Sequence, residues 1–355
     1  MNTNLNFFRK SKNLPIDEFF SNVLYDDKFG YYSAKMPFGK KGDYITSPKI
    51  SSLFSEMIAI WIISTWELIG KPKNFNIVEL GPGDGSLTNV LVNSFKKFPE
   101  FNSIKKIYLY EKSPFLRKFQ KKNINDKKIK WINNFKQIKK KGPIIFFGNE
   151  FFDAIPIKQF KKIKNIYYEK NYSLDKDCEI KEIFKKASSS DVKMIKSYKS
   201  LKKLKFVEFP KFGFKELKKM TDKVTKQKGC ILLIDYGYLK PNNQNTLQSV
   251  IRHKKNYILN NLGKADITAH VNFKLLNEFF FKNRLKIENV ITQKEFLENM
   301  GIYERAKIIA SSMKFSKQSD LYLRIRRLLS PNSMGNLFKV IIAHNLSNNN
   351  FLGFK

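Results

Sequence analysis

The hydrophobic positions along the chain switch between helix-like and strand-like patterns. Two N-terminal stretches predict helices: residues 15–35, which begin with Pro15 and turn at Gly30, and residues 50–69, whose apolar residues recur at helical spacing. After them come short apolar runs separated by amphipathic segments, the pattern of buried strands joined by helices. The strands are expected at 75–80, 105–111, 128–132 and 143–152, and the helices between them at 86–98 and 113–122.

This strand and helix order predicts an α/β fold of the Rossmann-like type, with a mostly parallel, doubly wound sheet. From residue 158 the chain is Lys-rich, and its apolar and polar residues alternate in short stretches. This pattern predicts an insertion of hairpins and a helix. Core strands are expected again at 229–237 and 336–345, with a helix opening near His270 between them. We therefore expect five parts along the chain. They are an N-terminal helical segment (1–72), a first half of the core (73–157), the insertion (158–225), a second half of the core with additional helices (226–345) and a polar tail (346–355).

The formal net charge of +36 admits two interpretations. Lysines neutralise phosphates, so the charge would suit a nucleic-acid binder. Against this, Lys outnumbers Arg by 59 to 8 and is spread along the chain, whereas arginine is the better side chain for binding phosphates and guanines. We therefore attribute the charge mainly to a compositional bias toward lysine, and a nucleic-acid partner is not our leading expectation.

Other bulk properties narrow the class of protein. The longest apolar runs, such as 57–64, fall well short of the roughly 20 residues that a membrane helix needs, so no membrane span is expected. Cys178 and Cys230 are too few for a disulfide framework or a four-thiolate zinc site, and His253 and His344 show no ligand spacing, so no metal is expected. The N-terminal residues lack the apolar run of a secretory signal, and a bacterial cytoplasmic location is the simplest expectation.

A glycine-rich loop, VELGPGDGSL, follows the first predicted strand of the core. Its glycines at Gly81, Gly83 and Gly85 fit G-x-G-x-G rather than the G-x-G-x-x-G of dinucleotide enzymes, so a dehydrogenase is the least favoured class. Glu79 lies two residues before the first glycine and is expected to take part in binding the ligand of this loop. In a doubly wound sheet such a loop lies at the carboxyl end of its strand, where ligands bind.

Polar side chains follow two other predicted strands. Glu111 ends the second strand, 26 residues after Gly85, at a position where a carboxylate accepts hydrogen bonds from both hydroxyls of a ribose. Asn149, Glu150 and Asp153 come directly after the fourth strand and are expected in the same crevice. A ligand with a ribose and an amino-acid head but no pyrophosphate fits this set, and S-adenosyl-L-methionine is such a ligand.

Several longer strings carry a family resemblance. They are GDYITSPKISSLFSEMIAIW (42–61), the glycine loop, NEFFDAIPIKQF (149–160), DYGY (235–238), TLQSVIRHK (246–254), DITAHVNF (266–273), TQKEFLENMGI (292–302) and MGNLFKV (334–340). In these strings, which run in order over about residues 15–340, the chain resembles the MidA/NDUFAF7 family. One departure is Asp84, where the family commonly has arginine, and we leave the role of this acid open.

The resemblance implies a class I S-adenosyl-L-methionine-dependent methyltransferase, in a family found in mitochondria and bacteria. Its mitochondrial members are protein arginine methyltransferases that modify a core subunit of respiratory complex I and are needed for complex I assembly. The residues that the resemblance places around the cofactor are Gly81, Gly83, Gly85, Glu111 and, in a segment that closes over it as a lid, Asp43, Thr46 and Ser47.

An arginine acceptor determines the chemistry expected of the site. Its guanidinium is charged at neutral pH, and carboxylates bind it through bidentate, charge-assisted hydrogen bonds. Glu150 is predicted to bind the guanidinium, Asn149 to orient it, and Asp153 to provide a further carboxylate of this clamp.

Two alternatives stay open. An RNA or DNA methyltransferase would use the same cofactor loop, and the basic charge would suit it. A non-catalytic assembly factor that binds a partner subunit would keep the fold with methyl transfer secondary or lost. In the leading interpretation the partner is a protein substrate, with a complex I core subunit implied by the resemblance, and a homodimer is left open.

Overall fold

The computed structural model of the chain describes residues 3–9, 11–34, 37, 42–43 and 45–354. Residues 35 and 44, which fall in the first predicted helical stretch and in GDYITSP, lie outside the described residues. The chain forms two compact units. The core unit comprises Ile45–Phe151, Lys218–Gly237 and Phe280–Lys355, and the accessory unit comprises Met1–Tyr44, Phe152–Leu217 and Tyr238–Phe279. The segment predicted at 1–72 is thus divided between the two units.

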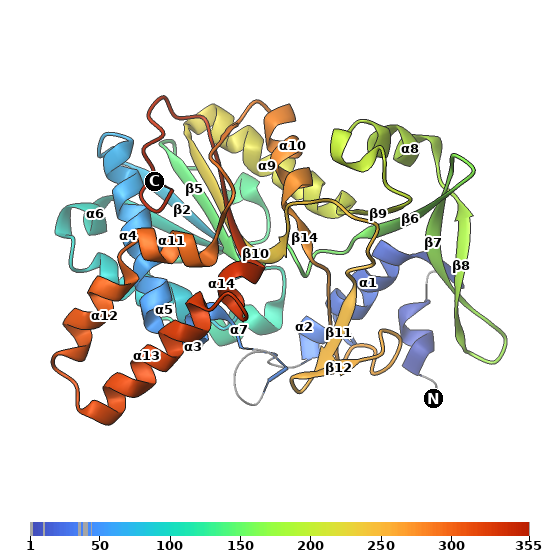
Figure 1. Cartoon of the computed structure of the whole chain (residues 1–355), viewed down its shortest axis with the longest axis horizontal. Coiled ribbons are helices and arrows are strands. Elements are labelled where there is room, and N and C mark those ends of the chain that lie inside the picture. Colours follow the sequence, from blue (N-terminus) through green and yellow to red (C-terminus); the bar gives the residue numbers. More distant parts are fainter. Residues whose placement is uncertain (1–2, 10, 35–36, 38–41, 44, 355) are drawn as a thin grey trace. The chain divides into compact units, whose positions relative to one another are not determined.

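A mostly parallel sheet forms the middle of the core unit (Figure 1). In order across the sheet, its strands are β15 (Lys286–Ile287), β17 (Phe338–His344), β10 (Gly229–Tyr238), β5 (Ile144–Asn149), β2 (Phe75–Leu80), β3 (Lys105–Tyr110) and β4 (Lys130–Ile132), with β16 (Ile291–Thr292) also pairing with β17. The strands from β10 to β4 pair in parallel, and β17 runs antiparallel to β10. The predicted α/β class with a mostly parallel sheet is confirmed.

Helices enclose this sheet. They are α3 (Ser47–Ile50), α4 (Ser52–Leu68), α5 (Ser86–Phe95), α6 (Pro99–Ile104), α7 (Pro114–Asn123), most of α9 (Lys211–Gln227), α11 (Gln293–Asn299), α12 (Ile302–Ala310), α13 (Phe315–Leu329) and α14 (Met334–Leu337), with the 3-10 turn η2 (Phe135–Gln137). Helix α4, which lies beside β2 and β5 in Figure 1, buries 11 of its 17 residues because it is apolar around most of its surface. Ser51 caps it by accepting a hydrogen bond from the Leu53 N–H at 3.3 Å. Among the described helices, none combines the length and apolarity that crossing a membrane requires.

The accessory unit is built on antiparallel pairing. One sheet has the order β1 (Asn13–Pro15), β7 (Ile166–Leu174), β6 (Lys158–Ile163) and β9 (Phe206–Phe209), with β8 (Ile180–Lys186) also paired to β7, and a smaller sheet has the order β12 (Lys254–Asn256), β11 (Gln248–Ile251) and β13 (Asp266–Thr268). Its other elements are η1 (Thr3–Phe7), α1 (Ile16–Tyr25), α2 (Tyr31–Ala34), α8 (Ser189–Lys196), η3 (Lys199–Leu201), β14 (Val271–Asn272) and most of α10 (Phe273–Lys282).

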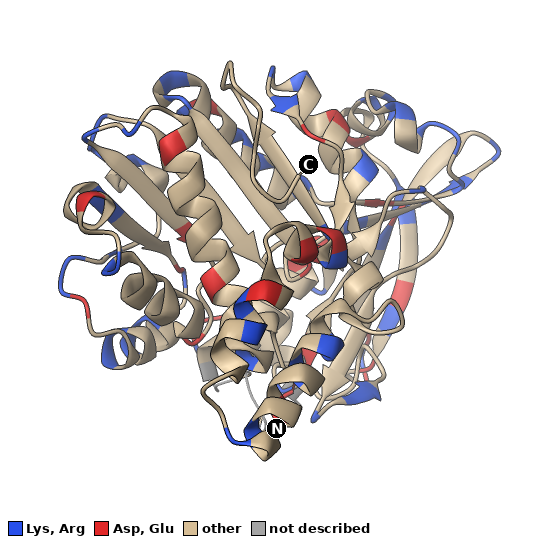
Figure 2. Ribbon diagram, turned by 60° about the vertical axis from the view of Figure 1, so that its left-hand side comes forward, with Lys and Arg blue, Asp and Glu red and all other residues tan. Residues whose placement is uncertain are grey.

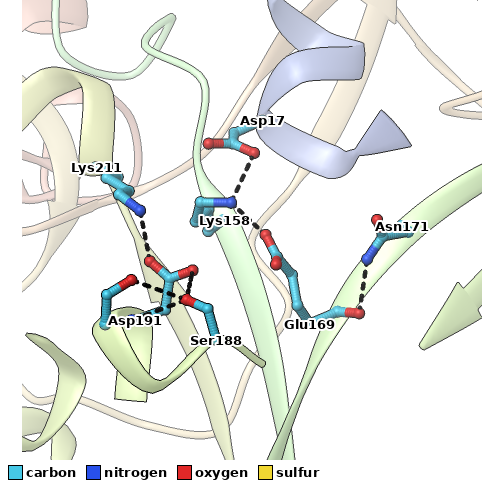
Figure 3. A network of polar contacts seen from close by, with 8 residues as sticks. Asp17, Lys158, Glu169, Asn171, Ser188, Asp191 and Lys211 are labelled. Atoms are coloured by element: carbon cyan, nitrogen blue, oxygen red, sulfur yellow. Dashed lines mark hydrogen bonds and ion pairs between the residues drawn. The ribbon is translucent and has the colours of Figure 1, made fainter. Parts of the chain in front are cut away.

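A buried network of charges joins elements of the accessory unit (Figure 3). The Lys158 amine of β6 lies 3.2 Å from Oδ1 of Asp17 in α1 and also pairs with Glu169 of β7. Beside it, Lys211 pairs with Asp191 at 2.6 Å. Burial lowers the pKa of Lys158, but the two carboxylates outweigh it and raise this pKa, so the amine stays charged. Buried charges persist in proteins when they are paired in this way.

The helix predicted to open near His270 is present, but it begins three residues later than His270. Asp266–Thr268 is the strand β13, Val271–Asn272 is β14, and α10 begins only at Phe273. Asn272 accepts a hydrogen bond from the Leu275 N–H at 3.0 Å and so serves the first turn of α10. Several polar residues precede this apolar run in the sequence. The last of them, Asn272, is the one that caps the helix.

Lysine and arginine lie on helices, strands and loops in many parts of the chain rather than on one element (Figure 2). This matches the even spread of lysine along the sequence. A groove that follows a nucleic-acid backbone instead gathers its basic residues on one face or along one helix.

Candidate active site

The glycine loop after β2 is the first part of the candidate site. Gly81, Gly83 and Gly85 have φ values of 60°, 57° and 83°, a conformation that residues with a side chain avoid. The loop is also crowded: a Cβ on Gly81 would lie 2.8 Å from Cδ2 of Phe151, and one on Gly85 would lie 2.8 Å from Cδ1 of Ile124. The loop therefore needs glycine both for its backbone conformation and for space.

One acid lies just before this loop and a second lies within it. Glu79 of β2 is buried and accepts a hydrogen bond from the Thr88 hydroxyl of α5. Burial raises the pKa of Glu79 to about 8, against the lowering effect of the Thr88 bond. Asp84 accepts the Ser86 N–H at 3.0 Å through Oδ1 and pairs with Lys49 of α3 through Oδ2. Asp84 thus fastens the start of α5 to α3, which gives a structural role to the residue that the sequence left open.

A fully buried glutamine connects the loop to Glu111. The Gln120 amide of α7 donates to the carbonyl oxygen of Gly83 at 2.8 Å and to Oε2 of Glu111 at 3.1 Å. Its oxygen accepts a hydrogen bond from the Trp131 ring N–H at 3.0 Å. Gln120 was not among the residues predicted from the sequence, and the available signal was its spacing of four residues after Leu116, on the buried side of α7.

Glu111 presents a fixed carboxylate at the carboxyl end of β3. It accepts the Ser113 N–H at 2.9 Å in addition to the Gln120 amide. Burial raises the pKa of Glu111, while these hydrogen bonds and the nearby Arg117 act in the opposite direction. A carboxylate at this position of a doubly wound sheet is suited to accepting hydrogen bonds from ribose hydroxyls.

The strand next to β2 ends in a second polar pair. Strand β5 runs parallel to β2 with Gly148 opposite Leu80, so Asn149 and Glu150 follow at the same sheet edge as the glycine loop. Glu150 has a left-handed φ of 51°, and its Oε1 accepts hydrogen bonds from the Asn149 amide at 3.0 Å and from the Ser47 N–H at 3.1 Å. Left-handed backbone at a residue with a side chain is strained and is concentrated at functional sites.

The side-chain oxygen of Asn149 is buried and has no hydrogen-bond partner among the residues that the structure describes. The orientation of the amide is fixed because its nitrogen donates to Glu150. An unsatisfied buried acceptor costs free energy that a ligand N–H group recovers. Asn149 is therefore suited to accept a hydrogen bond from a nitrogen that enters the site.

Three residues of GDYITSP that were expected to form a lid, Asp43, Thr46 and Ser47, have partners elsewhere in the chain. Ser47 is fully buried and its hydroxyl donates to Oε1 of Gln293 at 3.3 Å, while Thr46 is the N-cap residue of α3. Asp43 belongs to the accessory unit, where it accepts the Tyr31 hydroxyl at 2.7 Å. These contacts do not test the lid role of the three residues, which stays a prediction.

Asp153 belongs to the accessory unit, whereas Asn149 and Glu150 belong to the core unit. Within its unit Asp153 lies close enough to Asp266 to act on it electrostatically, and Asp266 accepts the Tyr32 hydroxyl at 3.2 Å. Burial, and then the charge of Asp153, raises the pKa of Asp266 to about 8. Asp266 is thus an additional buried acid that the sequence analysis did not select.

Comparison with known proteins decides the family. A family model described as "Putative S-adenosyl-L-methionine-dependent methyltransferase" matches residues 57–291. The chain belongs to this methyltransferase family. It is an S-adenosyl-L-methionine-dependent enzyme, and the predicted cofactor is confirmed.

Relatives of this methyltransferase cover most of its length. The mitochondrial protein arginine methyltransferase NDUFAF7 of Xenopus tropicalis is 29% identical over 352 residues, which is 92% of this chain and 81% of the relative. The Homo sapiens protein of the same name is 28% identical over 353 residues, 92% of this chain and 78% of the relative. A solved structure from Burkholderia thailandensis, bound to S-adenosyl-homocysteine, has a TM-score of 0.80 at 21% identity and covers 96% of this chain and 90% of its own. The family resemblance seen in the sequence is confirmed.

The relatives correct the expected location of the methyltransferase. We expected a bacterial cytoplasmic protein. The proteins of Xenopus tropicalis, Danio rerio and Homo sapiens that it matches are all named as mitochondrial, so this expectation is wrong by comparison with them.

Proposed function

We propose that the methyltransferase transfers methyl groups to arginine side chains of a protein. The observation that carries the proposal is the pair Asn149 and Glu150, which follows β5 at the sheet edge where the glycine loop follows β2. Phe151, the next residue, packs against Gly81 and so brings the two segments into contact. The name of the relatives, protein arginine methyltransferase, supports arginine as the acceptor.

The proposed cofactor site consists of the glycine loop and Glu111. When bound, S-adenosyl-L-methionine would supply the methyl group of its sulfonium: transfer to an acceptor nitrogen would break the sulfur–methyl bond, release S-adenosyl-homocysteine and cost that nitrogen one proton. Gly81, Gly83 and Gly85 let the backbone approach the methionine part, and the Glu111 carboxylate accepts the ribose hydroxyls. Gln120 holds both groups in place through its amide.

In the proposed acceptor site, Glu150 holds the guanidinium and Asn149 orients it. A carboxylate binds a guanidinium through charge-assisted hydrogen bonds, which keep one nitrogen facing the methyl group. The buried oxygen of Asn149 accepts an N–H from the same group and so selects which nitrogen this is. Asp153 is retained in the proposal as a further carboxylate for the acceptor.

We propose a core subunit of respiratory complex I as the first acceptor protein to examine, and support of complex I assembly as the biological role. This proposal rests on the family resemblance, since the geometry of the site selects a chemical group and not a particular protein. A lysate from cells that lack the methyltransferase provides unmodified acceptor for the test.

The test incubates the purified chain with labelled S-adenosyl-L-methionine and this lysate, followed by mass spectrometry of the labelled species. Glu150→Gln is expected to abolish transfer while calorimetry shows nearly native affinity for S-adenosyl-homocysteine. Glu100→Gln, an exposed acid of α6, is the matched control and should transfer at the native rate. Label found only in RNA would overturn the proposed function, and native turnover in Glu150→Gln would overturn the role given to Glu150.

A further inference from the structure

Helix α13 of the core unit has an apolar stripe on its outer side as well as on its buried side. The buried side carries Ile325, Leu328 and Leu329. On the other side, Phe315 is 83% exposed and Leu323 is 63% exposed. These two residues are eight positions apart, and residues at i, i+4 and i+8 share one face of a helix. A surface helix of a globular protein normally has a single apolar stripe, which faces the core.

Arginine is concentrated at the same place. Residues 302–329 form the hairpin of α12 and α13 in Figure 1 and contain four of the eight arginines of the chain, but only three of its 59 lysines. We attribute the many lysines mainly to composition, so a segment that has arginine instead is informative. The planar guanidinium binds a carboxylate through two parallel hydrogen bonds, which an ammonium cannot form.

Two of these four arginines have partners in the fold. Arg305 and Arg324 each form an ion pair with an acid of the core unit, at 2.8 Å in both cases. Arg326 and Arg327 are exposed, and neither forms an ion pair with another residue that the structure describes. They follow Leu323 by three and four positions and therefore border the outer apolar stripe.

We define the outer face of α13 as Phe315, Tyr322, Leu323, Arg326 and Arg327, of which Tyr322 is 40% exposed. Its composition is typical of a protein-binding surface, since aromatic residues and arginine are enriched at interfaces and lysine is depleted. The face contains no acid, and a second copy of a chain with a net charge of +36 would be repelled. An anionic lipid surface attracts lysine as well as arginine, so it does not account for the arginine. The complementary partner is an acidic protein surface.

The buried side of α13 contacts the part of the core unit that holds Glu150. Helix α13 packs against α3, and a guanidinium nitrogen of Arg324 donates to the carbonyl oxygen of Ile50, the last residue of α3, at 3.3 Å. At the first residue of α3, the Ser47 N–H donates to Oε1 of Glu150 at 3.1 Å. A protein bound to the outer face of α13 is therefore separated from the proposed acceptor site by elements in direct contact.

We infer that the outer face of α13 is a docking surface for the acceptor protein, which binds it through an amphipathic segment with carboxylates beside apolar side chains. The carboxylates pair with Arg326 and Arg327, and the apolar side chains cover Phe315 and Leu323. The inference deepens the proposed function and rests on it for the identity of the partner. Because docking takes no part in the chemistry, its loss should raise KM for the acceptor protein and leave kcat unchanged.

The first test is fluorescence anisotropy of a labelled peptide added to the full chain. The peptide is acetylated, amidated and about five helical turns long, with leucine along one face and glutamate at the borders of that face. A second peptide has glutamine for glutamate, and a third has serine for leucine. Both should bind about tenfold or more weakly than the first, because each lacks one half of the complementarity. Equal affinity of the three peptides, or no binding of the first, would overturn the inference.

A double substitution tests the cationic half of the face. Arg326→Gln with Arg327→Gln should weaken binding of the leucine–glutamate peptide about tenfold. The matched control is Lys127→Gln with Lys128→Gln, which removes the same charge from an adjacent exposed pair elsewhere in the core unit and should leave the affinity nearly native. Equal losses in the two double variants would mean that net charge alone attracts the peptide, and the docking surface would be wrong.

The apolar half has its own pair of variants. Phe315→Ser with Leu323→Ser should weaken peptide binding several-fold, because two apolar side chains are no longer buried by the partner. Phe281→Ser, at a position of α10 that is 76% exposed, is the control and should bind like the native chain. Thermal melting and affinity for S-adenosyl-homocysteine check the fold of each variant. Native peptide affinity in the folded Phe315→Ser, Leu323→Ser chain would contradict the inference.

Vesicles of phosphatidylcholine and phosphatidylserine test the other class of partner. We expect that any binding to them is the same in the native chain and in Phe315→Ser with Leu323→Ser. Vesicle binding that this double variant abolishes, without binding of the leucine–glutamate peptide, would replace the acceptor protein by a lipid surface and overturn the inference.

Methyl transfer separates this inference from the proposed function. Arg326→Gln with Arg327→Gln should raise KM for the methylated protein and leave transfer to a glycine–arginine–glycine peptide unchanged, since this peptide has no acidic or apolar segment. If the native chain methylates protein arginine and the double variant keeps the native KM, the docking surface is wrong and the proposed function stands. If the native chain methylates no arginine but binds the leucine–glutamate peptide through Arg326 and Arg327, the proposed function is wrong and the docking surface stands.

Discussion

The side-chain amide of Gln120 donates a hydrogen bond to the carbonyl oxygen of Gly83 across 2.8 Å. The two residues are 37 positions apart in the chain, one in α7 and the other in the loop after β2. Because the same amide also reaches Glu111 at 3.1 Å, it fixes the loop relative to the carboxylate that we propose for the ribose. The proposed cofactor site is thereby organised in advance, which would reduce the conformational cost of binding the cofactor.

Gln120→Leu should lower the affinity for S-adenosyl-homocysteine about tenfold or more, because a buried carbonyl and a carboxylate each lose a donor worth roughly 1–3 kcal/mol. Isothermal titration calorimetry measures the change. Gln227→Leu is the control, since Gln227 makes one bond near the end of α9, to the Lys140 carbonyl oxygen at 3.3 Å. Equal affinity in the two variants would show that Gln120 does not organise the site.

Gly81→Ala should also weaken cofactor binding, and Gly70→Ala should not. Both glycines have positive φ, 60° and 92°, so both variants pay a similar backbone strain of roughly 1–2 kcal/mol. A Cβ on Gly81 meets the Phe151 ring at 2.8 Å, whereas one on Gly70 has nothing within 4 Å. Gly81→Ala should therefore lose more stability than Gly70→Ala by urea unfolding, and it alone should lose affinity for S-adenosyl-homocysteine. Equal affinities would mean that contact with Phe151 does not shape the site.

The strands of the core sheet could be predicted because each is a run of consecutive apolar residues, which is typical of a buried strand. All six residues of β2 are buried, and the predicted and observed bounds coincide at 75–80. The glycine loop was recognisable for a similar reason, since positive φ at three close positions requires glycine whatever the rest of the fold does.

The remaining features depend on residues that are distant in sequence. Nothing near Gln120 indicates that it faces Gly83, and nothing near Glu150 indicates a left-handed φ. Apolar periodicity shows that a helix is buried but not which partner buries it, so the sequence did not divide the N-terminal segment between two units. The local pattern around His270 could not show that the neighbouring strand β13 pairs with β11 instead of continuing into a helix.

Asp266 should make the stability of the protein fall as pH rises. Burial and the charge of Asp153 raise its pKa from 3.8 to about 8, so between these values the folded chain keeps a proton that the unfolded chain has released. The unfolding free energy should then decrease with a slope of up to about 1.4 kcal/mol per pH unit from this group. Glu79, whose pKa burial raises to about 8, contributes with the same sign.

Asp266→Asn should flatten part of this dependence, because the amide mimics the protonated acid and cannot release its proton. Urea unfolding between about pH 5 and about pH 8 measures the slope. Asp27→Asn, at an exposed position of the same unit, should give a curve parallel to the native one. A native slope in Asp266→Asn would contradict the raised pKa.

Lys158→Met should be strongly destabilising, by roughly 3–5 kcal/mol, because it leaves Asp17 and Glu169 buried without their cation. The matched control is Lys181→Met, whose side chain is 62% exposed and pairs with Asp175 at 2.7 Å, and this change should have little effect on stability. Neutralising both carboxylates as well, with Asp17→Asn and Glu169→Gln, should recover much of the lost stability, since a buried ion cluster is costly mainly when it is incomplete. Urea unfolding of the three variants gives the comparison. If Lys158→Met proves no less stable than Lys181→Met, the buried network of Figure 3 does not hold the accessory unit together.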